Sequence, residues 1–496
     1  MFTQRRTTVI LPVTRYDDRL ASILDARGSI IRKRDFSQVS PFSFRYLNRE
    51  LSGYTSEAAK IIYMACVEAS IVMVMCDRGM CSERVMGEVL KACRELKAAE
   101  VYLFEYGKKG RVKGTKHDVR ALIKSICNRI SKLARPYVHA FATSYDIIDT
   151  ANAARLRDVL YDVVIPGLIT VEEHLIRLTL EYADVVQVGR THLQHGSPLT
   201  FGCPTAWFAT RLGRQIVRLQ RDANELVGKF SGPVGTHAPA KLAVRDPLRF
   251  EKQVLSCMGL GAGDFSTQIV IPECAVEVYH RLVMIAGVLA NLADDMRHLQ
   301  MTEIAEIAEP AGLLEGASSI MPHKINPITW ENIVSLFKEI IGRMVTRYLD
   351  LGSNLQRDLT NSASGRFAFE MVELLFTQVK GANRILPKVI VDPERMLYNL
   401  RLTGDQIISD PLNTLLRRFG HPDAHAKVTE LSRGARSKLT TLFEELMKDS
   451  ELRPFVEQLS RQHVSVLRHP EKYVGIGPSK ARAVVRRWAR KFNLAT

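Results

Sequence analysis

Residues 278–299 read VYHRLVMIAGVLANLADDMRHL and carry the clearest helical pattern in the chain. Apolar residues recur there in alternating steps of four and three, at Val278, Leu282, Ile285, Leu289, Leu292, Met296 and Leu299. That spacing places them on one stripe of a long α-helix. It is also close to the heptad seam of helices that pack almost parallel.

Four further stretches repeat this pattern, at about 151–184, 203–229, 329–350 and 366–385. Pro166 interrupts the first of them and predicts a kink, because proline has no N–H for the helical ladder. Five long helices with short connections predict a central bundle. We therefore expect an all-α protein.

Proline-rich breaks at Ala134–Pro136 and from Leu386 to Pro393 divide the pattern into three parts. We predict an N-terminal helical domain over 1–133, which includes an extension over 1–39. A central long-helix domain is expected over 134–386, and a C-terminal helical domain over 387–496.

The composition is that of a soluble globular protein, with 46% hydrophobic and 25% charged residues. No apolar run was judged long enough to cross a bilayer, so no membrane partner is expected. The N-terminus is basic but has no apolar core before a cleavage site, which excludes a secretory signal and leaves a mitochondrial presequence open. We expect a cytoplasmic protein.

The eight cysteines form no Cys-x-x-Cys pair and lie mostly in apolar, helix-like runs. They are expected to be free thiols of a reducing compartment. No His, Cys and carboxylate cluster has the local spacing of a zinc site. Neither a metal nor an organic cofactor is expected.

The net charge of +16 raises the possibility of a nucleic-acid partner. The charge is scattered, and its one concentration, over residues 480–491, is more typical of a solvated helix face. An anionic substrate also favours a positive protein, and we prefer that interpretation to nucleic acid.

Residues 316–327 read GASSIMPHKINP, a polar and glycine-containing segment between long helices. Asn326 and Pro327 are predicted to open the next helix, as an N-cap and a first-turn proline. A helix N-terminus beside Lys324 would favour an anion. A serine pair or a lysine alone is more often part of an ordinary surface loop, but the full string is far more specific.

The string resembles the signature of the fumarase/aspartase superfamily, Ser-Ser-x-Met-Pro-x-Lys-x-Asn-Pro, with Ala317 where glycine is usual. The resemblance implies β-elimination of fumarate, with Ser318 as the general base. The carbanion needs positive charge and N–H donors near its carboxylate, which Lys324 and Asn326 would supply. Ser319 and Met321, in the same signature, are predicted to contact the substrate.

Residues 190–195, RTHLQH, resemble a second element of the superfamily, Thr-His-x-Gln. The resemblance makes His192 the general acid that protonates the leaving amine, a role that suits the pKa of histidine. Thr191 would bind a substrate carboxylate. Glu331 corresponds to the glutamate that pairs with this histidine, although taken alone it is an ordinary first-turn acid.

Two other segments are similar to elements of these lyases: Lys116-His117-Asp118-Val119 and residues 138–146, VHAFATSYD. The resemblance implies that Thr143 and Ser144 hold succinyl carboxylate oxygens. His117, assigned to catalysis, and His139 would line the purine and phosphate side, and Asp118 would contact the substrate. Gln268 matches a substrate-orienting glutamine with lower specificity.

Residues 356–366, QRDLTNSASGR, resemble the segment with which adenylosuccinate lyases bind a nucleotide 5′-phosphate. Arg357, Ser362 and Arg366 fall on its three contact positions, and two guanidinium groups with a hydroxyl suit a phosphate chemically. Arg45 and Tyr46, in a Ser-Pro-x-x-x-Arg-Tyr element, would complete the nucleotide site.

The resemblance runs from about Ser40 into the C-terminal domain. It implies a carbon–nitrogen lyase that acts on a succinylated purine nucleotide, as a homotetramer whose active sites are shared between subunits. The alternatives are another lyase of the superfamily, of the argininosuccinate lyase or carboxymuconate cycloisomerase type, a non-catalytic structural relative, and a nucleic-acid-binding protein.

Overall fold

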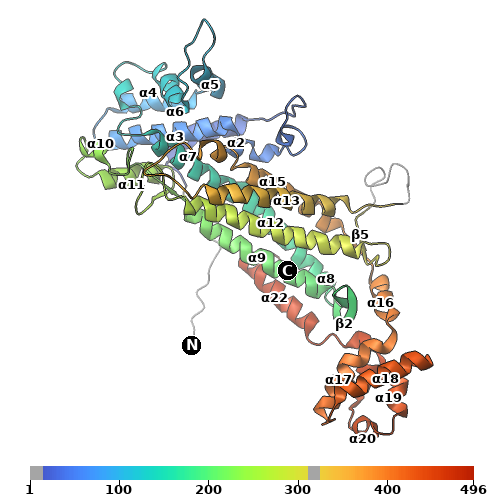
Figure 1. Ribbon diagram of the computed structural model, residues 1–496. Coiled ribbons are helices and arrows are strands. Elements are labelled where there is room, and N and C mark those ends of the chain that lie inside the picture. Colours follow the sequence, from blue (N-terminus) through green and yellow to red (C-terminus); the bar gives the residue numbers. More distant parts are fainter. Residues whose placement is uncertain (1–14, 311–323, 496) are drawn as a thin grey trace. The chain divides into compact units, whose positions relative to one another are not determined.

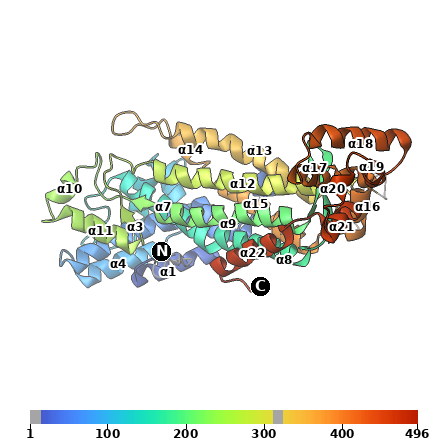
Figure 2. The ribbon, with the colours of Figure 1, turned by 90° about the horizontal axis from the view of Figure 1, so that it is seen from below.

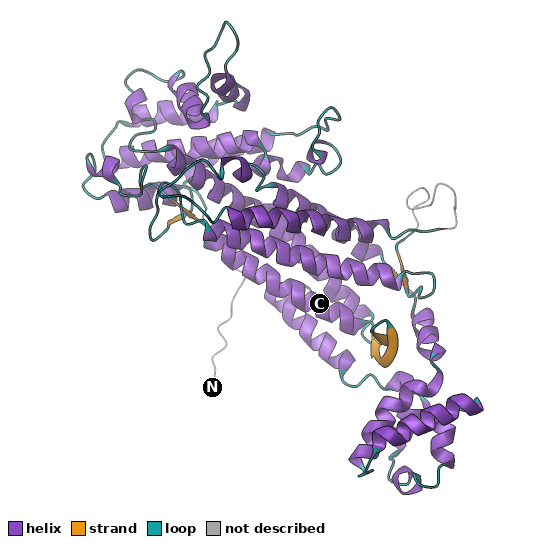
Figure 3. Ribbon diagram, viewed as in Figure 1, coloured by secondary structure: helices purple, strands orange, loops and turns teal. Residues whose placement is uncertain are grey.

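The computed structural model describes residues 15–310 and 324–495. Helices predominate in these residues and the strands are short, which confirms the all-α prediction (Figures 1 and 3). Contacts divide the chain into two compact units. The first comprises the residues up to Ile169, Gln215–Gly287 and Ser335–Lys380; the second comprises Thr170–Arg214, Val288–Val334 and the residues from Gly381 on. The three-domain division stays a prediction.

The long predicted helices are present, and each contributes residues to both units. They are α8 (Ile165–Glu181), α9 (Gly202–Asn224), α12 (Glu273–Leu299), α13 (Ile328–Leu349) and α15 (Glu370–Ile385). Figure 2 shows α9, α12 and α13 running alongside one another. Within the first unit, Arg281 of α12 pairs with Asp222 of α9 at 2.8 Å, and Arg343 of α13 pairs with Glu370 of α15 at 3.0 Å.

The expected interruption at Pro166 takes the form of a π-helical turn. Helix α7 (Ser144–Val159) leads into a π segment over Leu160–Val164, and α8 follows directly. Because Pro166 cannot donate a backbone hydrogen bond, a wider turn just before it accommodates the missing bond without ending the helix.

The first unit also contains further helices and one parallel strand pair. The helices are α1 (Ala21–Leu24), α2 (Ser52–Thr55), α3 (Glu57–Asp77), α4 (Glu83–Arg94), α5 (Ala98–Tyr106), α6 (Asp118–Cys127), α7, α10 (Ala238–Lys241), α11 (Pro247–Cys257) and α14 (Ser362–Gly365). The strands are β3 (Val227–Gly228) and β4 (Gly261–Ala262).

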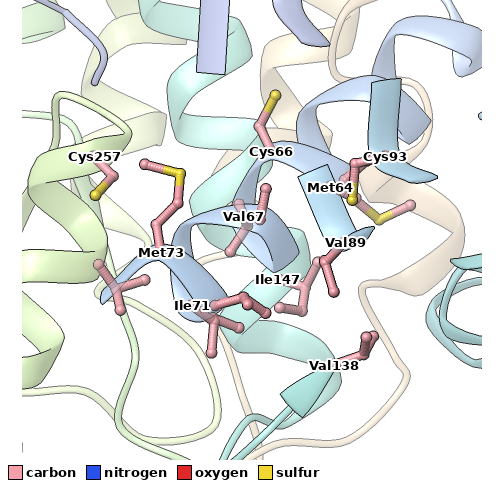
Figure 4. Packing of buried hydrophobic residues seen from close by; sticks show 14 of the residues in the cluster. Met64, Cys66, Val67, Ile71, Met73, Val89, Cys93, Val138, Ile147 and Cys257 are labelled. Carbon is pink, nitrogen blue, oxygen red and sulfur yellow. The ribbon is translucent and has the colours of Figure 1, made fainter. Parts of the chain in front are cut away.

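Helix α3 lies at the centre of the hydrophobic core of this unit. Ser56 caps its start by accepting a hydrogen bond from the amide of Ala59. Its side chains are buried on almost every face, and Met64 and Ile71 pack among residues such as Val89 and Ile147 (Figure 4). Such a helix is apolar all round because every face is covered.

By length and composition alone, α3 and α12 are apolar enough to cross a membrane, which the sequence analysis missed. The protein itself buries 83% of the apolar window of α3 and 56% of that of α12. Burial of this extent is the arrangement of core helices.

The N-terminal segment from residue 15, to which the sequence assigned no role, is packed into the first unit. Tyr16 and Tyr63 donate hydrogen bonds to Asp158 of α7, at 2.6 and 2.7 Å. Gly259 has φ +64°, and a β-carbon there would overlap the carbonyl oxygen of Arg15. The close approach requires glycine.

The second unit contains an antiparallel hairpin, a small strand pair and the C-terminal helices. The strands are β1 (Val186–Thr191), β2 (Gln194–Thr200), β5 (Ile307–Ala308) and β6 (Ile390–Val391). The helices are α16 (Pro393–Leu402), α17 (Ser409–Arg418), α18 (Ala424–Lys438), α19 (Leu442–Lys448), α20 (Arg453–Val456), α21 (Arg461–Arg468) and α22 (Gly477–Phe492). The basic run falls on α22, with Arg486, Arg487 and Arg490 exposed opposite the buried Val485 and Trp488, as predicted for a solvated helix face.

Candidate functional site

A cavity of about 360 Å³ in the first unit gathers six of the predicted site residues. They are His117, Asp118, Ser144, Arg357, Ser362 and Arg366. Three sequence segments far apart in the chain therefore meet at one polar cavity, which also receives Lys60, Glu105, Tyr145, Asp149 and Arg155. A concave site with few, converging polar groups is typical of small-molecule binding.

His117 and Ser144 lie within hydrogen-bond distance of each other in the lining of this cavity. His117 is the N-cap residue of α6 and Ser144 is the first residue of α7, and the His117 Nε2 to Ser144 Oγ distance is 3.3 Å. Lys60 donates to Asp118 Oδ2 at 3.0 Å. Burial raises the pKa of the Asp118 carboxyl, but Lys60 and the Val119 amide outweigh burial and hold that pKa below its usual range. Asp118 is therefore a carboxylate at neutral pH.

The start of α7 is held by a buried ion pair behind Ser144. Asp146 accepts hydrogen bonds from the amides of Thr143 at 2.7 Å and Ser231 at 3.1 Å. Lys229 donates to the same carboxylate, and both side chains are almost fully buried. This network fixes the helix end on which Thr143 and Ser144 lie.

The predicted phosphate-binding residues occupy one wall of the cavity. Arg366 Nη1 donates to Ser362 Oγ at 2.8 Å, one turn away across the end of α14. The Arg357 guanidinium lies 5.1 Å from the ring centre of Tyr145 and donates weakly to its hydroxyl at 3.4 Å. Both arginines thus keep donors for a ligand, and neither has a carboxylate partner among the described residues.

Three polar atoms that line this cavity are buried without a hydrogen-bond partner in the described part of the chain: His117 Nδ1, Glu105 Oε2 and Arg357 Nε. His117 Nδ1 lies 3.4 Å from Asp118 Oδ1 but forms no hydrogen bond with it. Buried polar groups are normally satisfied, so such a concentration of unsatisfied atoms favours a polar ligand.

Asp149 was missed by the sequence analysis, although it follows Asp146 by one turn of α7. Its Oδ2 accepts a hydrogen bond from the Val270 amide at 3.0 Å. Burial raises its pKa to about 6, against the opposing effect of that amide and of Lys229 and Arg357. A second cavity, of about 190 Å³, shares Asp149, Asn152 and Arg357 with the first and is more apolar.

Further predicted residues of the first unit are not in the lining of the 360 Å³ cavity. The backbone N–H of Gln268 donates to the backbone carbonyl of Gln356 at 3.3 Å, next to Arg357. His139 Nδ1 lies 2.7 Å from the buried Glu68 carboxylate. Burial lowers the pKa of His139, but Glu68 outweighs burial and raises it. Arg45 is exposed, and Tyr46 is partly buried beside the turn that starts at Pro41.

In the second unit, the segment around His192 is a β-hairpin. His192 and Leu193 form its two-residue turn, with φ +53° and +60°, between the paired Thr191 and Gln194. Positive φ at both turn positions is the type I′ arrangement, which matches the twist of the strands. Thr191, His192 and Leu193 are all exposed.

The base of the hairpin is anchored by Glu306, whose side chain is fully buried. Arg190 and Gln187 each donate to Glu306 at 2.6 Å, and Asn399 of α16 donates to it at 2.9 Å. His195 Nδ1 lies 2.7 Å from the hydroxyl of Thr403. The tip that carries His192 therefore projects from a firmly bonded base.

The predicted anion site at the start of α13 already has a carboxylate of the same chain beside it. The helix begins at Ile328, one residue later than expected. Glu309 Oε1 already accepts the amides of Thr329 and Trp330, at 3.0 and 3.1 Å. The helix dipole favours a carboxylate there, and the chain supplies its own.

Lys324 and Glu331 are exposed, and Asn326 is partly buried at a separate cavity of about 330 Å³ in the second unit. Among the described residues, neither Glu331 nor His192 has a side-chain partner, so one chain does not pair them. Ser318, Ser319 and Met321 lie outside the described residues.

Two family models together match most of the chain. Residues 35–342 match the family described as Lyase, and residues 353–474 match the family described as Adenylosuccinate lyase C-terminal. The adenylosuccinate lyase of Pyrococcus abyssi is 31% identical over 461 residues, covering 90% of this chain and 96% of that protein. The adenylosuccinate lyase of Archaeoglobus fulgidus is 30% identical over 454 residues, covering 90% and 98%.

Solved structures share the fold at lower identity. The fumarate lyase from Mesorhizobium sp. BNC1 superposes with a TM-score of 0.77 at 23% identity, covering 89% of this chain and 98% of that one. The 3-carboxy-cis,cis-muconate lactonizing enzyme from Pseudomonas putida gives 0.75 at 24% identity, covering 90% and 98%. These likenesses establish the helical fold.

Proposed function

The chain belongs to the adenylosuccinate lyase family, and on that premise we propose that it cleaves adenylosuccinate to AMP and fumarate, a step of purine nucleotide biosynthesis. It would also release fumarate from succinyl-aminoimidazole-carboxamide ribotide, which carries the same succinyl-amino group. Both substrates are anionic nucleotides, which suits the net charge of +16.

The observation that carries this proposal is the arrangement of charged residues in the 360 Å³ cavity. Arg357 and Arg366, with the Ser362 hydroxyl, offer the planar and flexible donors that a phosphate monoester needs. His117 and Ser144 lie in the same cavity and 3.3 Å apart. A nucleotide phosphate at the arginines therefore leaves donors elsewhere in the cavity for the rest of the molecule.

The chemistry is a β-elimination across a carbon–carbon bond of the succinyl group. Ser318 takes the proton from the carbon next to one carboxylate, the C–N bond breaks, and His192 protonates the leaving nitrogen. Because the intermediate is a doubly charged aci-carboxylate, Lys324 and Asn326 stabilise its oxygens. Glu331 pairs with the His192 imidazole in the assembled enzyme.

The remaining roles concern binding. The succinyl carboxylates are held by Thr143, Ser144 and Thr191. The hydrogen bonds and the ion pair of Asp146 keep Thr143 and Ser144 in place. His117 and His139 face the purine and phosphate. Asp118, Gln268, Ser319 and Met321 orient the succinyl-purine part, and Arg45 and Tyr46 close the nucleotide site.

We infer that the protein works as a homotetramer in the cytoplasm, with each active site built from several subunits. Support comes from α13, whose residues Ile341, Val345, Tyr348 and Leu349 are 46–72% exposed and recur on one face of the helix. A contiguous apolar face of this kind is typical of subunit contacts. It accords with the absence of a His192–Glu331 contact within one chain.

The direct test is to incubate the purified protein with adenylosuccinate and to measure fumarate and AMP by chromatography. Argininosuccinate and 3-carboxymuconate serve as parallel substrates for the two alternative lyase types. We expect stoichiometric fumarate and AMP from adenylosuccinate and no product from the other two. Turnover of either alternative without turnover of adenylosuccinate would overturn the proposal.

Two sets of variants separate chemistry from binding. Ser318→Ala and His192→Ala should each lower kcat by about 100-fold or more, because each removes an acid or base. Arg366→Gln should raise KM for adenylosuccinate by roughly 10- to 100-fold, the usual cost of a charged hydrogen bond. Arg418→Gln, an exposed arginine of α17, is the matched control and should change neither constant.

A further inference from the structure

Asp149 occupies the junction between the two neighbouring cavities of the first unit. It lines both the polar cavity of about 360 Å³ and the more apolar cavity of about 190 Å³. Arg357 lines both as well. A carboxylate and a guanidinium therefore lie where the two cavities adjoin.

One oxygen of Asp149 has a structural partner. Oδ2 accepts a hydrogen bond from the backbone N–H of Val270 at 3.0 Å. Two residues earlier, the backbone N–H of Gln268 donates to the backbone carbonyl of Gln356 at 3.3 Å. Asp149 thus holds the segment over residues 268–270 against α7. The same segment, through Gln268, holds Gln356, the residue before Arg357. Replacing the carboxylate by an amide keeps an oxygen that can accept from Val270.

The other oxygen, Oδ1, accepts no hydrogen bond from any residue in the part of the chain that the structure describes, while Asp149 keeps a part of its surface open to the cavities. An ionised carboxylate accepts several hydrogen bonds and is costly to bury with some of them missing. The burial that raises its pKa to about 6 leaves it ionised above that pH. A donor from a ligand would satisfy this oxygen.

We propose that Asp149 Oδ1 accepts a hydrogen bond from a ribose hydroxyl of the bound nucleotide. The inference rests on the proposed function, in which the nucleotide phosphate binds Arg357, Ser362 and Arg366. Ribose is the group joined directly to a 5′-phosphate, so its hydroxyls come next along the ligand. An acidic side chain beside a phosphate site is a recurring acceptor for ribose hydroxyls.

Under this proposal Asp149 makes the enzyme selective for ribonucleotides. Adenylosuccinate and its 2′-deoxy and 3′-deoxy analogues differ only at the hydroxyls that Asp149 would bind. A site built to hydrogen-bond a hydroxyl rejects the analogue that lacks it, because its own polar group is then left unpaired. The wild-type enzyme is expected to prefer the ribonucleotide over one of the analogues by roughly 10- to 100-fold in kcat/KM.

The test measures kcat/KM on all three substrates for the wild type, Asp149→Asn and Asp18→Asn. Asp18 is exposed at the N-terminal segment, so the same chemical change there is a matched control that should alter nothing. Asp149→Asn should lose roughly 10- to 100-fold on the ribonucleotide and little on the sensitive deoxy analogue, so that the preference disappears.

The outcomes separate the two proposals. Equal wild-type rates on all three substrates would overturn the role of Asp149, and that arm does not depend on any variant folding. An equal loss by Asp149→Asn on all three would show a purely structural role and would also overturn it. If the wild type released no fumarate from any of them, the proposed function would fall and this inference with it.

Discussion

Replacing Lys229 by methionine should destabilise the first unit by about 3 kcal/mol, because it leaves the buried Asp146 carboxylate without its counter-charge. Lys229 and Asp146 are 1% and 0% exposed. Removing one partner of such a pair costs about 3 to 5 kcal/mol. The amides of Thr143, Ser231 and Gly232 still donate to the carboxylate, which places Lys229→Met at the lower end.

The reciprocal change, Asp146→Asn, should cost about 4 to 5 kcal/mol. The ammonium of Lys229 then loses its counter-charge, and the NH2 group of the new amide faces backbone N–H donors that the carboxylate had accepted from. The double variant should be at least about 2 kcal/mol more stable than the sum of the two losses predicts, because no charge remains unpaired. Urea unfolding followed by circular dichroism gives all three free energies.

Lys380→Met provides the matched control in the same unit. Lys380 pairs with Glu50 at 2.9 Å, but both side chains are almost half exposed, so the loss should stay below about 1 kcal/mol. Strict additivity of the two buried substitutions, or a loss at Lys229 as small as that at Lys380, would refute the view that a buried pair holds the start of α7.

Three further predictions concern single groups. Glu68→Gln should destabilise the protein more at pH 6 than at pH 9 in urea titrations. Glu68 raises the pKa of His139, so the stabilisation from this pair is present below the pKa of His139 in the unfolded chain and is lost as pH rises through its pKa in the folded protein. Leu193→Gly should raise stability by about 1 kcal/mol by relieving a positive φ, while looser placement of His192 lowers kcat; an unchanged unfolding midpoint would count against strain in the turn. Asp149→Asn should raise the thermal midpoint at pH 7 but not at pH 4. The pKa of Asp149 lies near 6 instead of 3.8, so ionising its carboxyl lowers the free energy of unfolding at pH 7 and not at pH 4. An equal shift of the midpoint at both pH values would contradict this.

The long helices could be predicted because their apolar residues lie on one face of each helix. In α12 the apolar stripe from Val278 to Leu299 reports directly on burial, and the helix was placed within a few residues. The hairpin over 186–200 could not be predicted in the same way. Gly189, Pro198 and a register shift between Val188 and Arg190 break the two-residue alternation of its strands.

Local motifs predicted several of the residues that line the polar cavity. Arg357, Ser362, Arg366, His117 and Ser144 each stand in a recognisable string, and they do share a cavity. Asp149 and Glu309 act through tertiary contacts instead. The partner of Glu309 lies twenty residues further on, at the start of α13, and that of Asp149 lies in a segment joined to it only by the fold. Spacing along a chain carries no signal for such pairs.

Some of the residues to which chemistry is assigned carry a cost in stability. The cavity of the first unit keeps a buried donor unpaired at Arg357 and a carboxylate with a raised pKa at Asp149. The hairpin of the second unit holds His192 in a left-handed conformation that most residues avoid. At the base of the hairpin, Glu306 accepts hydrogen bonds from three residues. Each costly feature sits on a well-bonded support, as Asp146 and Lys229 support Ser144. A folded chain retains such costs when a ligand or a reaction uses them, because substitutions that relieve them would otherwise be neutral or stabilising. Where strain or an unsatisfied polar group coincides with a sequence motif, as at Arg357 and His192, it therefore adds support to the role that the motif predicts.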